Sequence, residues 1–139
     1  MKDSKEMVTQ FESDFFKAYQ RTVRSLGEKA RRMSRTAIIE RTIFSQADSY
    51  YVEPETVLRQ LAYFGANGRF NTKRRCISEK YYDIMRRYNE LQVLRRGEKA
   101  IDIAAEVVYS PAPRFYINTK SAFYIYYRAL KKNRGAKVL

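Results

Sequence analysis

The chain has 139 residues, of which 45% are hydrophobic, and a net charge of +13 from 28 Lys and Arg against 15 Asp and Glu. This length suits one domain with a buried core, and the apolar share excludes wholesale disorder. No run approaches the roughly 18 apolar residues of a membrane span. The charged N-terminus lacks the apolar stretch of a signal peptide, and Cys76 is the only cysteine, so we expect a cytoplasmic protein.

The spacing of apolar residues predicts an all-α fold of five to six helices. From Met7 to Met33 they recur every three or four positions, which predicts one long helix that continues through Gly27. Pro54 suits the first turn of a later helix, and the Gly-Ala-Asn-Gly segment at residues 65–68 is expected to end it. The remaining helices are expected, in chain order, over residues 36–44, 73–96, 98–109 and 119–132.

Two segments of the chain resemble each other at an offset of 65 residues. Each reads as a helix, a short aromatic extended segment and a capped helix, over about residues 36–64 and 101–129. We interpret them as a pseudo-symmetric pair within one helical domain, residues 1–139, since a solenoid usually needs three or more repeats. The pattern also allows a short two-stranded ribbon between residues 50–52 and 115–117. Chance similarity between Tyr-rich helices is the alternative.

The second copy contains SPAPRFYI at residues 110–117, and the Tyr-rich segment KYYDIMRRY precedes it at residues 80–88. On these residues, and over about half of its length, the chain resembles small basic proteins carried by phages and mobile elements of gut anaerobes. The resemblance brings no activity with it, so it implies no functional residue.

The sequence lacks the residue types of several familiar catalytic and metal sites. Because it has no His, it cannot form a Ser-His-Asp or Cys-His site of the usual kind. No His and a single Cys also exclude a standard zinc site. No glycine-rich phosphate loop or dinucleotide-binding fingerprint is present. We therefore expect a protein without catalysis, cofactor or metal.

The strongest functional pattern lies on the first predicted helix. At about 100° per residue its cations fall within about 100° of arc, opposite the apolar face, and span about 27 Å. Guanidinium groups bind phosphate oxygens in a bidentate way, so the pattern predicts contacts with the phosphates of DNA or RNA. These cations are Lys17, Arg21, Arg24, Arg31, Arg32 and Arg35. A solvated face with the same cations is the alternative.

Lys73, Arg74 and Arg75, at the start of a later helix, are a second candidate anchor. The helix dipole disfavours cations there, and a bound anion would relieve the repulsion. Two weaker patterns accompany them. Residues 65–68 resemble the GxxG clamp of KH-type RNA-binding proteins, and residues 56–88 resemble a helix-turn-helix with a long turn.

The aromatic residues allow two interpretations. The run at 123–127 contains three of the 12 tyrosines, and it is suited to stacking on unpaired bases or to a core or oligomer interface. We expect a non-catalytic, weakly sequence-specific nucleic-acid-binding protein that contacts phosphates through an Arg-rich helix face. The alternative is a structural or adaptor protein of a phage or mobile element that binds an acidic protein partner. A homo-oligomer and attachment to an anionic membrane surface also fit the composition.

Overall fold

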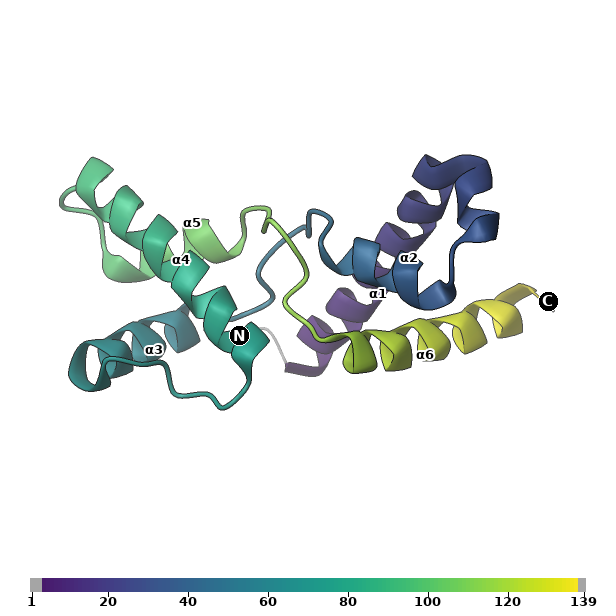
Figure 1. Cartoon of the computed structure of the whole chain (residues 1–139). Coiled ribbons are helices and arrows are strands. Elements are labelled where there is room, and N and C mark those ends of the chain that lie inside the picture. The colour runs from purple at the N-terminus through teal and green to yellow at the C-terminus, as the bar shows by residue number, and fades with distance from the viewer. Residues whose placement is uncertain (1–3, 138–139) are drawn as a thin grey trace. The chain divides into compact units, whose positions relative to one another are not determined.

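The computed structural model describes the backbone of residues 4–137 and the side chains of residues 5–132. This range contains six α-helices, one 3-10 helix and no strand, so the predicted all-α fold is confirmed. None of these helices is long and apolar enough to cross a bilayer. The elements in Figure 1 are α1 Ser4–Leu26, η1 Gly27–Arg32, α2 Arg35–Ile43, α3 Pro54–Asn67, α4 Arg75–Leu94, α5 Ala100–Val108 and α6 Thr119–Lys137.

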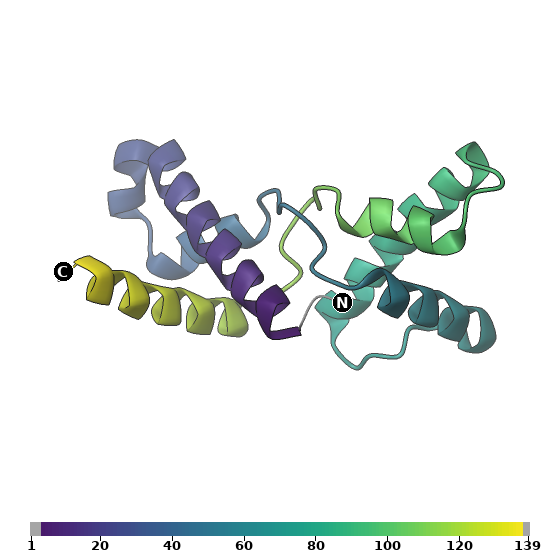
Figure 2. The ribbon, with the colours of Figure 1, turned by 180° about the vertical axis from the view of Figure 1, so that it is seen from behind.

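The chain divides into two compact units, whereas its length predicts one domain. Unit 1 comprises residues 1–47 and 112–139, and its helices α1, α2 and α6 all pack against one another (Figures 1 and 2). Unit 2 comprises residues 48–111 and contains α3, α4 and α5, with α5 packed on both of the others. The first half of the chain forms α1, α2 and α3, and the second half forms α4, α5 and α6. The last helix of each half is exchanged, because α3 packs with α4 and α5 and α6 packs with α1 and α2.

The 65-residue offset expected from the sequence also describes the structure. α2 and α5 begin and end 65 residues apart, and so do the first residues of α3 and α6. Ala47 and Ala112 are equivalent at this offset, and they form a reciprocal antiparallel bridge with N···O distances of 2.9 and 3.0 Å. Ser45 and Ser110 each donate a side-chain hydrogen bond of 2.6 Å to the carbonyl three residues earlier. These matching contacts make chance similarity a poor explanation of the repeat.

The aromatic segments after α2 and α5 are held by hydrogen bonds to helix ends. In unit 2 the Tyr50 amide donates to the Val108 carbonyl at 3.0 Å, and in unit 1 the Phe115 amide donates to the Ile43 carbonyl at 2.8 Å. Each bond satisfies a carbonyl that its helix leaves without an intrahelical partner. The predicted ribbon between the two segments is therefore wrong, because the amides of Tyr50 and Phe115 donate to carbonyls at helix ends and do not pair the two segments.

The predicted first helix, which passes through Gly27 to about Met33, is wrong in its second half. α1 ends at Leu26, because Gly27 adopts a φ of 59° and the chain continues as η1. Ser34 then begins α2 as its N-cap, with its hydroxyl accepting a hydrogen bond of 3.1 Å from the Ala37 amide. The cations of the predicted stripe are consequently divided among three elements.

Aromatic side chains form much of both cores. In unit 1 the buried rings of Phe15 and Phe115 meet edge-on with centroids 5.2 Å apart, and Phe11 lies 5.8 Å from Phe115. In unit 2 Phe70 is buried in the loop between α3 and α4, with its ring centroid 4.7 Å from that of Phe64. Since Phe115 lies just before α6, its burial holds that helix in unit 1.

Candidate nucleic-acid interface

Most of the net positive charge belongs to unit 1. Its residues 1–47 and 112–139 hold 17 Lys and Arg against 6 Asp and Glu, a net charge of +11. Unit 2, residues 48–111, holds 11 against 9, a net charge of +2. No acidic residue follows Glu106 in the sequence, so α6 carries cations alone. The positive electrostatic potential is therefore concentrated on unit 1.

Lys17, Arg21 and Arg24 form the α1 basic face. All three side chains are exposed, and their spacing of four and three residues places them within about 60° of arc. They point away from Phe15, which is fully buried on the same helix. This part of the predicted stripe is retained, on a helix that ends at Leu26.

The structure separates the other predicted cations of unit 1 from the α1 basic face. Arg31 and Arg32 are exposed at the end of η1. Arg35 is the first residue of α2, and its guanidinium donates a hydrogen bond of 3.1 Å to the Tyr127 hydroxyl. The Arg35 guanidinium also lies 5.4 Å from the centre of the Tyr126 ring. Arg35 is therefore a neighbour of α6, which the sequence pattern did not suggest.

The second predicted anchor lies in unit 2. Lys73 and Arg74 precede α4 and Arg75 is its first residue, and all three side chains are exposed. Arg75 forms an ion pair with Glu79 one turn later, with Nε and Oε1 3.3 Å apart. The charge of Arg75 is thus partly balanced within the helix. We therefore expect Lys73 and Arg74 to attract an anion more strongly than Arg75 does.

One face of α6 combines exposed rings of the aromatic run at 123–127 with cations that were not among the predicted contacts. The aromatic run at 123–127 divides between two sides of the helix. Tyr126 is 7% exposed, whereas Tyr124 is 62% and Tyr127 is 46% exposed. The exposed residues within about 100° of arc, here named the α6 face, are Lys120, Tyr124, Tyr127, Arg128 and Lys131. The acid-free sequence after Glu106 is the signal that would have pointed to this helix.

The equivalent face of α3 differs at all five positions. Subtracting the offset of 65 gives Glu55, Arg59, Ala62, Tyr63 and Ala66. Two buried residues of α6, Ala122 and Tyr126, correspond to the apolar residues Val57 and Leu61 of α3, whereas buried Ile125 corresponds to Gln60. The shared architecture therefore explains part of the buried side of α6, but not the cations and exposed tyrosines of the α6 face.

The residues of the α6 face differ in how firmly they are held. Arg128 forms an ion pair with Glu12 of α1, with Nη2 and Oε1 2.7 Å apart. The Tyr127 ring stacks on Phe123 with centroids 6.0 Å apart and an angle of 23° between the ring planes. Among the described side chains, Tyr124 has no hydrogen bond or ring contact. Tyr124 is therefore the ring most available to a ligand.

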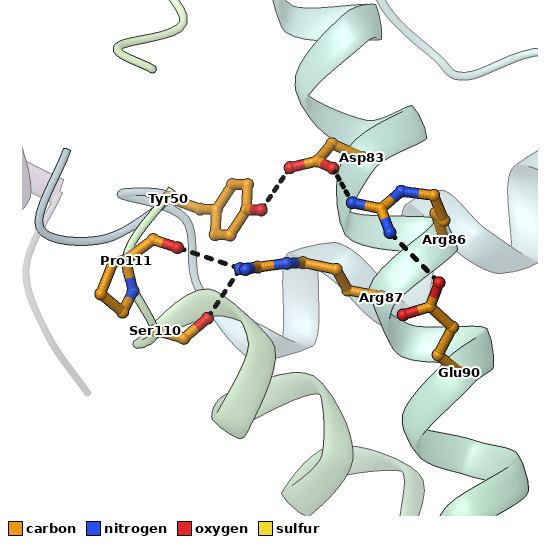
Figure 3. Close-up of polar contacts among 7 residues, drawn as sticks. All are labelled: Tyr50, Asp83, Arg86, Arg87, Glu90, Ser110 and Pro111. Atoms are coloured by element: carbon orange, nitrogen blue, oxygen red, sulfur yellow. Dashed lines mark hydrogen bonds and ion pairs between the residues drawn. The ribbon is translucent and has the colours of Figure 1, made fainter. Parts of the chain in front are cut away.

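A polar cluster in unit 2 joins α4 to the neighbouring segments (Figure 3). The Tyr50 hydroxyl donates to the Asp83 carboxylate, which also accepts a hydrogen bond of 2.8 Å from Arg86. Arg87 donates to the Ser110 hydroxyl at 3.1 Å and to the Pro111 carbonyl at 3.0 Å. These bonds fix the segments beside α4, so we assign the cluster a structural role.

The two weaker motifs of unit 2 have structural explanations. Residues 65–67 belong to the last turn of α3, and Gly68 ends the helix with a φ of 70°. The glycines of the KH-like motif thus form a helix end. The seven residues 68–74 that join α3 to α4 exceed the three or four of a helix-turn-helix.

The described side chains include no group of three or more His, Cys, Asp or Glu placed to hold a metal ion. Comparisons with protein families, curated proteins and solved structures gave no significant match. The geometry and charge of the two units are therefore the basis for the proposals below.

Lys80 gives unit 2 a measurable pH dependence. Burial lowers the pKa of this half-buried lysine on α4 to about 8. Between about pH 8 and the ordinary lysine pKa of 10.5, the unfolded chain binds more protons than the folded chain, so the free energy of unfolding rises with pH. From about pH 8 to about pH 9.5 we expect the free energy of unfolding to rise by roughly 1.5 kcal/mol, measured by urea denaturation. Lys80→Met should abolish the rise, and an unchanged rise in that variant would assign it to another group.

Proposed function

We propose that this protein binds nucleic acid without catalysis, chiefly through unit 1. The observation that carries the proposal is the net charge of +11 on unit 1, displayed on the exposed α1 basic face and α6 face. Guanidinium and ammonium groups bind phosphate oxygens, which are the same at every nucleotide. We therefore expect weak sequence specificity.

The proposed contacts come from three places in the chain. The α1 basic face binds phosphates, and Arg31 and Arg32 at the end of η1 add two exposed cations. The α6 face, with Arg35 beside it, supplies further cations. Lys73 and Arg74 of unit 2 are a second anchor, with Arg75 as a weaker member. The proposal includes a cytoplasmic location, since the lone cysteine fits a reducing compartment.

A fluorescence-anisotropy titration of the full chain tests this function. The labelled ligands are duplex DNA, single-stranded DNA and RNA, each at about 50, 100 and 200 mM salt. If about five of these cations contact phosphates at the same time, counterion release should weaken binding by about 100- to 500-fold over this range. Absence of binding to all three ligands at the lowest salt would contradict the proposal and favour an acidic protein partner.

Two charge-matched variants locate the contacts. The slope of log affinity against log salt concentration is negative. Lys17→Glu/Arg21→Glu/Arg24→Glu should reduce its magnitude by about 3, because three phosphate contacts are lost. The control changes three exposed cations of unit 2 outside the proposed contacts. It is Arg59→Glu/Arg96→Glu/Lys99→Glu. Circular dichroism checks that both variants keep their helices, and an equal loss in both would show that net charge alone attracts the ligand.

A further inference from the structure

We infer that the α6 face binds single-stranded nucleic acid, with Tyr124 stacking on an unpaired base and Lys120 and Lys131 contacting phosphates on either side. The inference rests on the proposed function and specifies its ligand. It names a contact made by a ring, which phosphate attraction alone would not require.

The exposure of Tyr124 is the first argument. Its side chain is 62% exposed, and it carries no hydrogen bond or ring contact among the described residues. The equivalent position of α3 holds Arg59, so the architecture does not call for an aromatic ring there. Stacking a base on this ring would remove apolar surface from water and is tolerant of sequence, because every base has a π-face.

The spacing of the cations is the second argument. Along the helix axis Tyr124 lies about 6 Å from Lys120 and about 10 Å from Lys131. Two to three nucleotides cover these distances at the roughly 3.4 Å spacing of stacked bases. A single strand with one base on Tyr124 thus places phosphates near both lysines, and no acidic side chain of α6 opposes them.

Tyr127 extends the aromatic surface beside Tyr124. Its ring stacks on Phe123 and its hydroxyl accepts a hydrogen bond from Arg35, so its orientation is fixed before a ligand arrives. A pre-ordered side chain loses less conformational entropy on binding than a free one. Tyr127 remains 46% exposed and adds contact area for a neighbouring base.

The rings favour a single strand over a duplex. In a duplex the bases are stacked on each other, and a protein side chain reaches their faces only after unstacking them. In a single strand the base faces are available to aromatic side chains, while the phosphates still bind cations. The α6 face offers both kinds of contact on one side of one helix, so the single strand is the ligand that uses all of it.

Substitutions of Tyr124 in the full chain test the inference. The probes are a labelled oligo-dT of about 20 nucleotides and a mixed-sequence duplex of equal length. Tyr124→Ala should weaken binding of oligo-dT by about 5- to 100-fold and change duplex binding by less than about twofold. Tyr124→Phe should retain binding because the ring remains. Tyr109→Ala removes a tyrosine of unit 2 that is 55% exposed, and this matched control should leave the affinity for oligo-dT unchanged.

A spectroscopic measurement reports stacking directly. The chain contains no tryptophan, so Tyr124→Trp introduces one fluorophore at the proposed contact. Oligo-dT should quench this fluorescence with the same midpoint as the anisotropy titration, and the duplex should not. Quenching by both ligands alike would contradict a contact specific to unpaired bases.

A further variant separates this inference from the proposed function. Lys120→Glu/Lys131→Glu removes cations of the α6 face and should weaken binding of both probes. If that variant loses affinity while Tyr124→Ala binds oligo-dT normally, the stacking inference is overturned and the proposed function stands. If the unaltered chain binds neither probe, both are overturned.

Discussion

Phe115→Ala is expected to lower the free energy of unfolding of unit 1 by about 3 to 5 kcal/mol. The Phe115 ring is 1% exposed and meets Phe15 edge-on at 5.2 Å, so truncation removes a buried aromatic contact and leaves a cavity. The segment that carries it leads into α6, whose attachment to α1 and α2 should weaken with it. Urea denaturation followed by circular dichroism measures the loss.

Phe44→Ala is the matched control for this prediction. Phe44 belongs to the same unit and is 65% exposed, although the Arg114 guanidinium lies 4.4 Å from its ring centroid. Loss of this cation–π contact should cost about 0.5 to 1 kcal/mol. Equal destabilisation by both substitutions would contradict the central position assigned to Phe115.

Phe70→Ala should destabilise unit 2 by about 3 to 4 kcal/mol. Phe70 is 2% exposed, and its ring centroid lies 4.7 Å from that of Phe64 on α3 and 4.9 Å from that of Tyr82 on α4. Gln60 binds both the N–H and the carbonyl of the next residue, Asn71, so the loop is tied to α3 at this point. Truncation removes the ring that connects the loop to both helices.

Hydrogen exchange together with urea denaturation measures the effect of Phe70→Ala. We expect faster exchange in residues 68–74 and in the first turns of α4. Leu94→Ala, at an exposed position of unit 2 (78%), should change stability by no more than about 0.5 kcal/mol. Unchanged exchange in the loop would contradict the role assigned to Phe70.

Local signals predicted the later helices better than the first. Pro54 begins α3 as expected, and the helix ends within the predicted segment 65–68, at Gly68, because Pro and Gly each have a specific backbone preference that acts locally. A single Gly is tolerable within a helix, so Gly27 alone does not predict the end of α1, although Ser34 is a good N-cap for a new helix. Apolar periodicity through this region obscured the break, since η1 and the start of α2 continue a similar spacing.

The candidate site was only partly predictable for a different reason. The helical wheel placed Lys17, Arg21 and Arg24 together because all three lie on one unbroken helix. It could not place Arg35 beside Tyr127, because that contact joins residues 92 positions apart. Periodicity shows which side of a helix is buried but not which helix covers it, so the α6 face became visible only in the folded chain.

Because α6 packs with α1 and α2, and α3 packs with α4 and α5, the two units become able to fold at different times during synthesis on the ribosome. Unit 2 is one continuous stretch, residues 48–111, and its helices can pack as soon as α5 has emerged. Unit 1 must wait, because its first two helices need α6 from the other end of the chain. During that interval the surface of α1 and α2 that α6 covers in the folded unit is exposed to other molecules. A product truncated before Thr119 would lack α6, and with it the third helix of the unit that carries most of the positive charge.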